Sequence, residues 1–452
     1  IYGYVSVIVS IISFLMFYYV LTPFQGKQLE FLSLKINIFS ATIYSAVVLA
    51  TILIMFFTMV ESKQNSEKSF IAFISLLLVQ SSTFFIVSSE TWLLVFFGII
   101  ILFSSFNFYI RYLSQMKETV EKKKYLSSST LMNSLSLALL FVGISILYFS
   151  SESFDAFSML YSDVWSYLGI MIIFVSLFVS AGIPPFHSWM FRYSDVEEIS
   201  PSIFLLVIQR GVILAFLSKF SLQIYVIGLS SLLTWLFLVG GIVLTLWGSI
   251  GAMTINKLKK LLHYSSLIYM GIVLMLLSNI MAAKNQIVLL YDSLETLSFI
   301  LVVYVIVFIF SFSTVGLLSK RYKNDDITKL KDLGRRSNSL FLFTCLSYFI
   351  IFALPIALPF ISNNLFFANT SDIREVLLSI NYSIMIIFSL VYMIRLVKWL
   401  FTEDYRRIVE LNYVEPGTYI SFLLSILYLV LTIIFINSFL ENLSTIAELL
   451  LG

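Results

Sequence analysis

Long apolar runs separated by short polar segments dominate the chain. Runs of about 20 residues are long enough to cross the hydrocarbon core of a bilayer as helices. The period-two alternation of a membrane barrel is absent. The pattern therefore predicts an all-α integral membrane protein with about thirteen transmembrane helices. These are expected near residues 4–22, 38–60, 69–88, 91–112, 126–149, 163–182, 200–221, 224–247, 261–279, 286–317, 338–361, 375–401 and 417–440.

Three of these runs carry signs of irregular helices. The run 286–317 is longer than a bilayer needs, so we expect it to be tilted, broken or extended into the interface. Prolines lie just after the run 163–182, at Pro184 and Pro185, and within the run 338–361, at Pro355 and Pro359. On periodicity alone these prolines are ordinary kinks. Discontinuous helices are also a transporter design that brings polar backbone near the bilayer midplane.

Basic residues gather on one side of the predicted membrane. Most of the 28 Lys and Arg residues follow even-numbered helices, including those within 122–124, 257–260 and 320–336. The positive-inside rule then places the N-terminus and these loops in the matrix or cytoplasm. An odd number of helices places the C-terminus on the opposite side.

Composition narrows the chemistry that this chain can perform. It is 60% hydrophobic and 12% charged, whereas a soluble domain is about 25% charged. Two histidines, His187 and His263, and one cysteine, Cys345, are too few for several haems or a thiolate metal cluster. A phosphate-binding glycine loop and a dinucleotide fingerprint are also missing from the sequence. We expect no catalytic residue, metal site, cofactor or nucleic-acid partner on this chain.

Three stretches of sequence resemble a known membrane protein family. They are AGIPPFHSWMFRYSDVEEISPSIFLLVIQR at 181–210, GSIGAMTINKLKKLLHYSSLIYMG at 248–271 and DLGRRSNSLFLFTCLSYFIIFALPIALPFISNN at 332–364. The chain is similar to the antiporter-like membrane subunits of proton-pumping NADH:ubiquinone oxidoreductase, respiratory complex I. The pair Gln209 and Arg210 favours the subunit 2 branch over the larger subunits 4 and 5 and over multisubunit cation/proton antiporters.

The resemblance implies a fold with two inverted five-helix repeats. It divides the chain into N-terminal helices, a first repeat, a second repeat and a C-terminal helix with a tail, at 1–66, 67–222, 223–402 and 403–452, with broken helices near 182–186 and 353–363. One N-terminal helix of the family has no counterpart. A split gene and a degenerate start are the two alternatives, and in the first a separate small chain supplies the helix.

The resemblance also implies four positions that carry protons in the family, one Glu and three Lys. They fall here on Ile100, Ser180, Arg210 and Asn363. A hydroxyl or an amide cannot hold a charge, and a guanidinium stays protonated in proteins. Membership of the complex is therefore better supported than a complete proton path made by this chain in the family's manner. A scaffold role is the alternative.

Other ionisable residues within the predicted helices are candidates for a proton path or central polar axis. Asp292 and Glu295 lie one turn apart on one helix, and burial there is costly, so an ion pair between Glu295 and Arg210 is one hypothesis. An interfacial position for Asp292 is the alternative. Lys259, Lys260 and His263 lie at the basic end of another helix, where an interfacial role and a relay role are both open. We expect His187 to cap or brace the first broken helix.

The leading functional hypothesis is a membrane-arm subunit of the oxidoreductase in the mitochondrial inner membrane. NADH, FMN, iron–sulfur clusters and ubiquinone then belong to the rest of the complex. Expected partners are other membrane-arm subunits, neighbouring antiporter-like subunits and lipids. Two alternatives are a free-standing inverted-repeat cation/proton antiporter and a purely structural membrane subunit.

Overall fold

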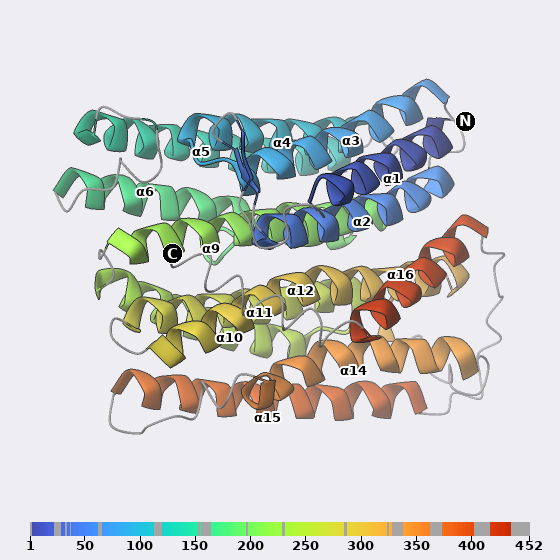
Figure 1. Cartoon of the computed structure of the whole chain (residues 1–452). Helices are drawn as coiled ribbons and strands as arrows, with labels where there is room; N and C mark the ends of the chain where they lie inside the picture. The colour runs from blue at the N-terminus through green and yellow to red at the C-terminus, as the bar shows by residue number, and fades with distance from the viewer. Residues whose placement is uncertain are drawn as a thin grey trace. The chain divides into compact units, whose positions relative to one another are not determined.

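The computed structural model of this chain is almost entirely helical (Figure 1). It describes residues 2–21, 29–31, 34–36, 38–61, 66–112, 120–151, 154, 164–195, 198–227, 231–283, 287–322, 325–327, 338–361, 373–401 and 416–434. By their contacts the residues form two compact units. Of the described residues, those within 1–193 and 200–230 form unit 1, and those within 194–199 and 231–437 form unit 2.

Unit 1 is a bundle of long helices with one short hairpin. The hairpin strands, Leu29–Phe31 (β1) and Leu34–Ile36 (β2), are antiparallel and pair Glu30 with Lys35. The helices are α1 (Tyr2–Leu21), α2 (Ile38–Glu61), α3 (Ser66–Ser88), α4 (Trp92–Tyr112), α5 (Val120–Ser151), α6 (Val164–Ala181), α7 (Ser188–Phe191), α8 (Ser200–Ile203), the π-helix η3 (Phe204–Gln209) and α9 (Arg210–Ile227). The 3-10 turn η2 (Arg192–Asp195) begins in unit 1, and its last two residues belong to unit 2.

Unit 2 is a second helical bundle, drawn from yellow-green to red in Figure 1. Its helices are α10 (Ser231–Thr254), α11 (Leu258–Ala282), α12 (Ile287–Tyr322), α14 (Asn338–Ile361), α15 (Ile373–Phe401) and α16 (Pro416–Ile434). The backbones of α10 and α11 approach closely at two glycines. A Cβ built on either Gly241 or Gly271 would lie 2.8 Å from the carbonyl oxygen of the other. Small residues allow such close packing of membrane helices.

The predicted transmembrane helices are confirmed. Among the described residues, ten helices are long and apolar enough to cross a membrane, and α1, α14 and α16 contain further apolar stretches at Tyr2–Met16, Leu342–Ala353 and Thr418–Val430. The sequence analysis missed the hairpin β1–β2. Its signal was the alternation Leu-Glu-Phe and Leu-Lys-Ile, which is short but has the period of a strand.

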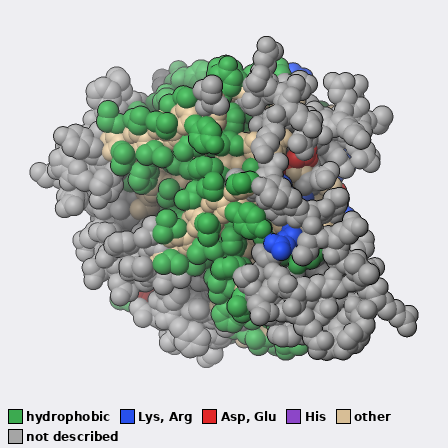
Figure 2. Space-filling view, turned by 90° about the vertical axis from the view of Figure 1, so that its right-hand side faces the viewer, with side chains coloured by type: hydrophobic (Ala, Val, Ile, Leu, Met, Phe, Trp, Pro, Cys, Tyr) green, Lys and Arg blue, Asp and Glu red, His purple; other side chains and the backbone are tan. Residues whose placement is uncertain are grey.

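Burial separates central helices from peripheral ones. The apolar windows of α11 and α12 are each 94% buried, whereas those of α5 and α15 are 33% buried. The outer positions of α5 and α15 carry large apolar side chains such as Phe141, Phe149, Ile387 and Ile394. Figure 2 shows that the described side chains on the face in view are mostly hydrophobic. Such a surface is suited to contact with lipid or with other membrane helices.

The first predicted helix break is confirmed. Helix α6 ends at Ala181, Gly182 follows with φ +65°, the Pro184–Pro185 bond is cis, and α7 begins at Ser188. A side chain at position 182 would adopt the left-handed region that favours glycine. Its Cβ would also lie 2.6 Å from the Met190 sulfur. Backbone conformation and packing therefore both require glycine at this turn.

The second predicted break is wrong over residues 353–361. Helix α14 continues through Pro355 and Pro359 to Ile361, and the remainder of the predicted break, with Asn363, lies outside the described residues. A proline removes one N–H from the helix ladder, and neighbouring helices can satisfy the carbonyl that this frees. The sequence Ala-Leu-Pro also lacks a glycine that could turn the chain as Gly182 does.

The long run predicted at 286–317 is one continuous helix. Helix α12 has 36 residues, which span about 54 Å at 1.5 Å per residue. The break considered for this run is therefore wrong. Its interior contains no proline, and its one glycine, Gly316, lies near the C-terminal end. The excess length must be accommodated by tilt or by extension beyond the hydrocarbon core.

Candidate functional site at the broken helix

The C-terminus of α6 is a fully satisfied helix end inside unit 1. A helix leaves its last four carbonyl groups without intrahelical donors. The amides of Ile183 and Gly182 donate to the carbonyls of Phe178 (2.9 Å) and Val179 (3.2 Å). These are the two bonds of a Schellman motif, which a left-handed glycine makes possible. No described backbone amide donates to the remaining two carbonyls, those of Ser180 and Ala181, so their donors must be side chains.

Gln209 and Arg210 supply those two donors. Gln209 Nε2 donates to the Ser180 carbonyl at 3.4 Å, and Arg210 Nε donates to the Ala181 carbonyl at 2.9 Å. Because the carbonyl end of a helix carries partial negative charge, a cation is favoured there. The side chain of Arg210 is fully buried, and its Nη2 lies 3.0 Å from the Met190 sulfur. Arg210 therefore joins α6, α7 and α9.

A π-helix precedes this pair. After Ser200–Ile203, the chain winds as η3 over Phe204–Gln209 before α9 begins at Arg210. The wider winding shifts the register of the side chains relative to a continuous α-helix, and single π turns recur at functional sites. Sequence periodicity could not predict it, because every residue of η3 except Gln209 is apolar.

Polar contacts continue from the broken helix to α5. Gln209 Nε2 also lies 3.2 Å from Asn133 Oδ1. One turn away, Ser136 Oγ donates to the Ser176 carbonyl at 3.0 Å, and Ser176 Oγ donates to the Ser136 carbonyl at 2.7 Å. The hydroxyl of Ser180, at a family lysine position, donates to the Leu177 carbonyl at 3.0 Å. This network consists of neutral groups that join α5 to α6.

His187 stands at the start of the helix after the break. It occupies the N-cap position of α7, but its side chain makes no capping hydrogen bond. Its ring instead packs edge-on against Phe191, with the ring centres 5.4 Å apart. The imidazole therefore does not cap the amides of α7 itself, and its role in capping or bracing the broken helix stays a prediction. Bracing of the turn remains the role that this contact supports.

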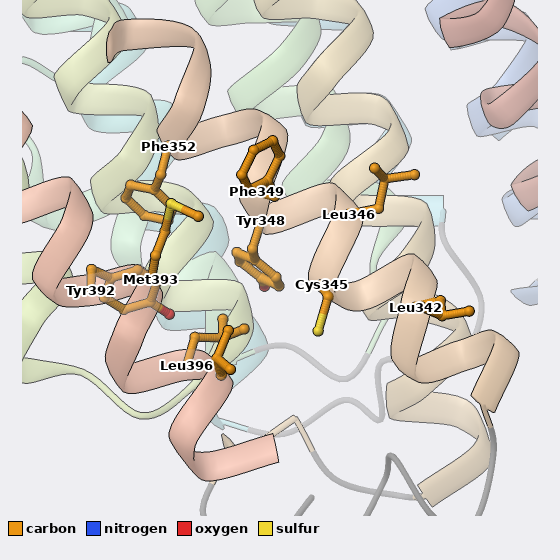
Figure 3. Close-up of a pocket in the computed structure, with 10 residues that line it drawn as sticks. Leu342, Cys345, Leu346, Tyr348, Phe349, Phe352, Tyr392, Met393 and Leu396 are labelled. Carbon is orange, nitrogen blue, oxygen red and sulfur yellow. The ribbon is translucent and has the colours of Figure 1, made fainter. Parts of the chain in front are cut away.

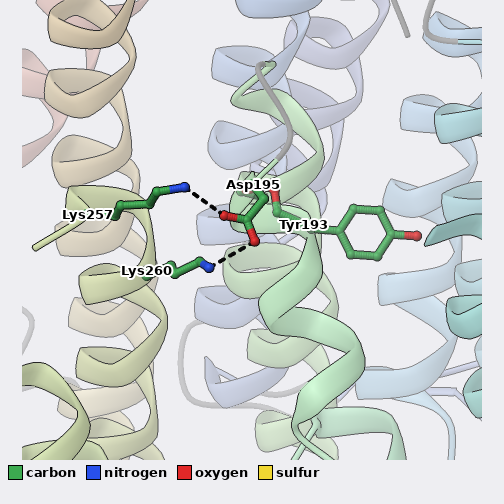
Figure 4. A network of polar contacts seen from close by, with 5 residues as sticks. Tyr193, Asp195, Lys257 and Lys260 are labelled. Atoms are coloured by element: carbon green, nitrogen blue, oxygen red, sulfur yellow. Dashed lines mark hydrogen bonds and ion pairs between the residues drawn. The ribbon is translucent and has the colours of Figure 1, made fainter. Parts of the chain in front are cut away.

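An acidic residue beyond the break binds two lysines of unit 2 (Figure 4). Asp195 lies in the segment 194–199, which belongs to unit 2 by its contacts. Its carboxylate oxygens accept from Lys257 Nζ at 3.0 Å and Lys260 Nζ at 2.9 Å. Partial burial acts to raise the pKa of Asp195, but the hydrogen bonds and charges of Lys260 and Lys257 outweigh it and lower that pKa. The hydrogen bond with Asp195 raises the pKa of Lys257.

Two further candidates on α11 are buried. Lys259 is 4% exposed and His263 is fully buried. Residues four apart share one helix face, so both side chains point the same way. His263 was also considered for an interfacial role. Burial within the helix bundle does not decide between the interfacial role and the relay role, and both stay predictions.

Tyr269 on α11 contacts the proline-containing helix of unit 2. Its buried hydroxyl donates to the Ile351 carbonyl at 3.0 Å. In a regular helix that carbonyl accepts from the amide of residue 355, but Pro355 has none. The Tyr269 hydroxyl supplies the missing donor.

The carboxylates Asp292 and Glu295 both lie on α12, one turn apart and partly exposed. The ion pair of Glu295 in unit 2 with Arg210 in unit 1 stays a prediction. Ile100, the position of the family acid, lies on α4 and is partly exposed. Within the described ranges, no group of three or more His, Cys, Asp or Glu side chains could hold a metal ion.

Sequence reasoning missed three polar anchors. Lys219 Nζ donates to the carbonyls of Val87 (2.9 Å) and Ser89 (2.6 Å), at the end of α3. In unit 2, Arg374 Nη1 donates to Asn279 Oδ1 at 2.6 Å. The signal for Lys219 and Arg374 was a lone cation near the end of an apolar run. The third anchor, a contact between Glu61 and the Ser200 hydroxyl, joins residues too far apart in sequence to leave such a signal.

Comparisons with known proteins agree with this architecture. The chain is 28% identical over 188 residues to NADH-ubiquinone oxidoreductase chain 2 of Rhizopus oryzae, which covers 38% of this chain and 32% of that protein. It is 24% identical over 292 residues to NADH-quinone oxidoreductase subunit N of Azoarcus sp., which covers 60% of this chain and 57% of that protein. The matched regions thus span about a third to somewhat over half of the length of these relatives.

A solved structure shows the same fold. A chain in respiratory complex I from Thermus thermophilus with bound aureothin superimposes with a TM-score of 0.73 at 16% identity, covering 98% of this chain and 94% of that one. The model of the family described as NADH:quinone oxidoreductase/Mrp antiporter, TM, matches residues 89–389, more than half of the chain. This stretch contains both the broken helix α6 and α14. The chain therefore belongs to the NADH:quinone oxidoreductase/Mrp antiporter transmembrane family.

Proposed function

We propose that this chain is an antiporter-like subunit in the membrane arm of a proton-pumping NADH:ubiquinone oxidoreductase of the mitochondrial inner membrane. The relatives named above are subunits of such oxidoreductases, and this supports the proposal. Electron transfer from NADH through FMN and iron–sulfur clusters to ubiquinone then takes place on other subunits. The partners of this chain are other membrane-arm subunits, including antiporter-like ones, and lipids.

The proposed orientation places the N-terminus in the matrix and the C-terminus on the intermembrane-space side. The concentration of Lys and Arg in loops on one side of the membrane supports it. Lys257 and Lys260, which bind Asp195, then lie on the matrix side at the start of α11.

Within that complex, the broken helix of unit 1 serves as a scaffold with a fixed charge. The single observation that carries this proposal is the end of α6, where Gln209 and Arg210 satisfy the carbonyls of Ser180 and Ala181. A guanidinium bound to a carbonyl keeps its proton at any physiological pH, so it stabilises the break without releasing a proton. A lysine at position 210 could have changed its charge, because burial lowers the pKa of a lysine toward the working pH.

The candidate proton-path groups that can change charge are in unit 2. Lys259 and His263 share a buried face of α11, and Asp292 and Glu295 share a face of α12. The contribution of this chain to proton translocation that we propose runs through these side chains. Buried lysines and carboxylates can shift their pKa values toward the working pH, as proton relays require.

Affinity purification of the tagged chain from detergent-solubilised membranes tests membership of the complex. The proposal predicts that NADH:quinone reductase activity and the membrane-arm subunits copurify with the chain. Purification as a monomer or homodimer without these subunits would instead support the free-standing cation/proton antiporter.

Proton translocation per electron pair tests the role of unit 2. We compare the native complex with Glu295→Gln and Lys259→Gln forms at equal assembly, and use Gln223→Glu, outside the proposed path, as a control for altered charge. A lower stoichiometry with normal electron transfer in both variants supports a proton path through unit 2. Unchanged stoichiometry in both leaves the whole chain as scaffold.

A further inference from the structure

Three lysines lie close together at the start of α11. Lys257 and Lys260 keep 47% and 28% of their side-chain surface exposed, whereas Lys259 is 4% exposed. Lys259 shares a face of α11 with His263, which is fully buried. Two of the three cations therefore lie at the surface, and the third enters the helix bundle of unit 2.

This arrangement needs a negative charge close by. The N-terminus of a helix carries a partial positive charge that disfavours cations, and like charges repel one another more strongly away from water. Asp195 supplies the negative charge, because one carboxylate oxygen accepts from Lys257 Nζ at 3.0 Å and the other from Lys260 Nζ at 2.9 Å (Figure 4). The charges of Asp325 and Asp326 act on Lys257 more weakly. Asp195 therefore compensates both outer lysines.

The compensating charge comes from the chain that leaves the broken helix. Asp195 is the last residue of η2, which follows α7 directly. It precedes Lys257 by 62 residues, so the ion pairs join two distant parts of the sequence within unit 2. A displacement of the segment 194–199 would therefore change the charge around the start of α11.

The backbone of this turn is held by contacts other than the ion pairs. The Leu258 amide donates to the Asp325 carbonyl at 2.9 Å. The hydroxyl of Tyr348 on α14 (Figure 3) donates to the Leu258 carbonyl at 3.4 Å. Arg395 on α15 donates to the side-chain oxygen of Asn256. Removing the carboxylate should therefore change the charge at the start of α11 and leave its backbone in place.

We propose that Asp195 is a positioning residue for Lys259. By neutralising Lys257 and Lys260, it allows the third lysine to carry its proton inside unit 2, on the face that it shares with His263. This role rests on the proposed proton path through unit 2, to which Lys259 belongs. The segment that follows the broken helix thereby controls the charge of a group on that path.

Reductive methylation of the intact purified complex tests this role. Formaldehyde with a borane reductant modifies a neutral amine, and an ordinary lysine is almost fully protonated near neutral pH, so the rate reports the proton on Lys259. Asp195→Asn should raise this rate several-fold, as measured by mass spectrometry. The double variant Asp195→Asn with Lys260→Gln restores the native net charge, and the rate should fall again. Loss of a purely structural tether would not be reversed in this way.

Asp325→Asn is the matched control. It removes a carboxylate that acts on Lys257 only weakly and keeps the Asp325 carbonyl that binds the Leu258 amide, so it should raise the rate at Lys259 much less. The rate at Lys219 in unit 1 is the internal reference and should not change. The proposal is overturned if Asp195→Asn leaves the rate at Lys259 unchanged, if Asp325→Asn raises it equally, or if it stays high in the double variant.

Methylation does not depend on proton pumping, so the two proposals fail separately. An unchanged stoichiometry of proton translocation in the Lys259→Gln complex would contradict the path through unit 2. The response of Lys259 to Asp195→Asn would still decide whether Asp195 controls its charge.

Discussion

The two units handle an interrupted helix in different ways. In unit 1 the helix stops at Gly182, and a charged side chain, Arg210, reaches its last carbonyl. In unit 2 the helix continues through Pro355, and a neutral hydroxyl, that of Tyr269, reaches the carbonyl of Ile351. Ending a helix exposes four carbonyls and the negative end of its dipole, whereas a proline within a helix frees one carbonyl.

This difference explains why the stronger anchor is in unit 1. The end of α6 needs two backbone bonds and two side-chain donors, and a cation gains from the dipole there. One hydroxyl is enough for α14. In both cases a neighbouring helix satisfies polar backbone that lipid could not. Removing each donor separately therefore measures how much the stability of each helix depends on it.

Arg210→Met should have the largest effect. It leaves the Ala181 carbonyl buried without its donor and removes the charge at the end of α6, which we expect to cost about 3 kcal/mol of stability. Thermal inactivation of the purified complex measures this loss. Arg210→Lys keeps the charge and should lose less. Equal stability of native and Met forms would show that α6 does not depend on this contact.

Gly182→Ala should follow, at about 2 kcal/mol. The alanine would have to adopt φ +65° and place its Cβ against the Met190 sulfur. The double variant with Met190→Ala separates the two causes, because it relieves the clash and leaves the backbone strain. Thermal inactivation of the single and double variants measures both. Full rescue by Met190→Ala would contradict the need for a left-handed glycine.

Tyr269→Phe should cost about 1 kcal/mol, the value of one neutral hydrogen bond. Pro355→Ala restores an amide donor for the Ile351 carbonyl, so the same tyrosine substitution should cost less in that background. A double-mutant cycle on thermal inactivation gives the coupling between the two positions. Additive effects would mean that Tyr269 does not replace the donor that Pro355 lacks.

The smallest effect is expected for Asp195, which is exposed and screened by solvent. Its lowered pKa means that its contribution to stability is present above its unfolded pKa of about 3.9 and is lost as pH falls through the lower folded value. The contribution of Lys257 to stability has the opposite pH dependence, because its pKa is raised. This contribution is present below its unfolded pKa of about 10.4 and is lost as pH rises through the higher pKa of the folded state. The stability of the native form should therefore exceed that of the Asp195→Asn form near neutrality. The two should begin to converge only as pH falls below about 4. A difference that persists in strong acid would contradict the ion pair.

Much of this fold could be predicted from the sequence, because membrane helices depend on long apolar runs. The first break was also predictable from Gly182, Pro184 and Pro185. The contact of Arg210 with Ala181 was not predictable, because these residues are 29 positions apart in sequence. Their contact depends on the π-helix η3 and on the packing of α9 against α6. The contact of Tyr269 with the Ile351 carbonyl was not predictable either. Its role as a donor depends on the register between α11 and α14, which the sequence does not contain.

The central claim is that Arg210 stabilises the broken helix and does not carry protons. Proton translocation per electron pair, measured for native and Arg210→Gln complexes reconstituted at equal assembly, tests it most directly. Gln can still donate to the Ala181 carbonyl but has no charge. The account predicts lower thermal stability and an unchanged stoichiometry. A reduced stoichiometry with normal electron transfer and unchanged stability would contradict it, and would place Arg210 on the proton path.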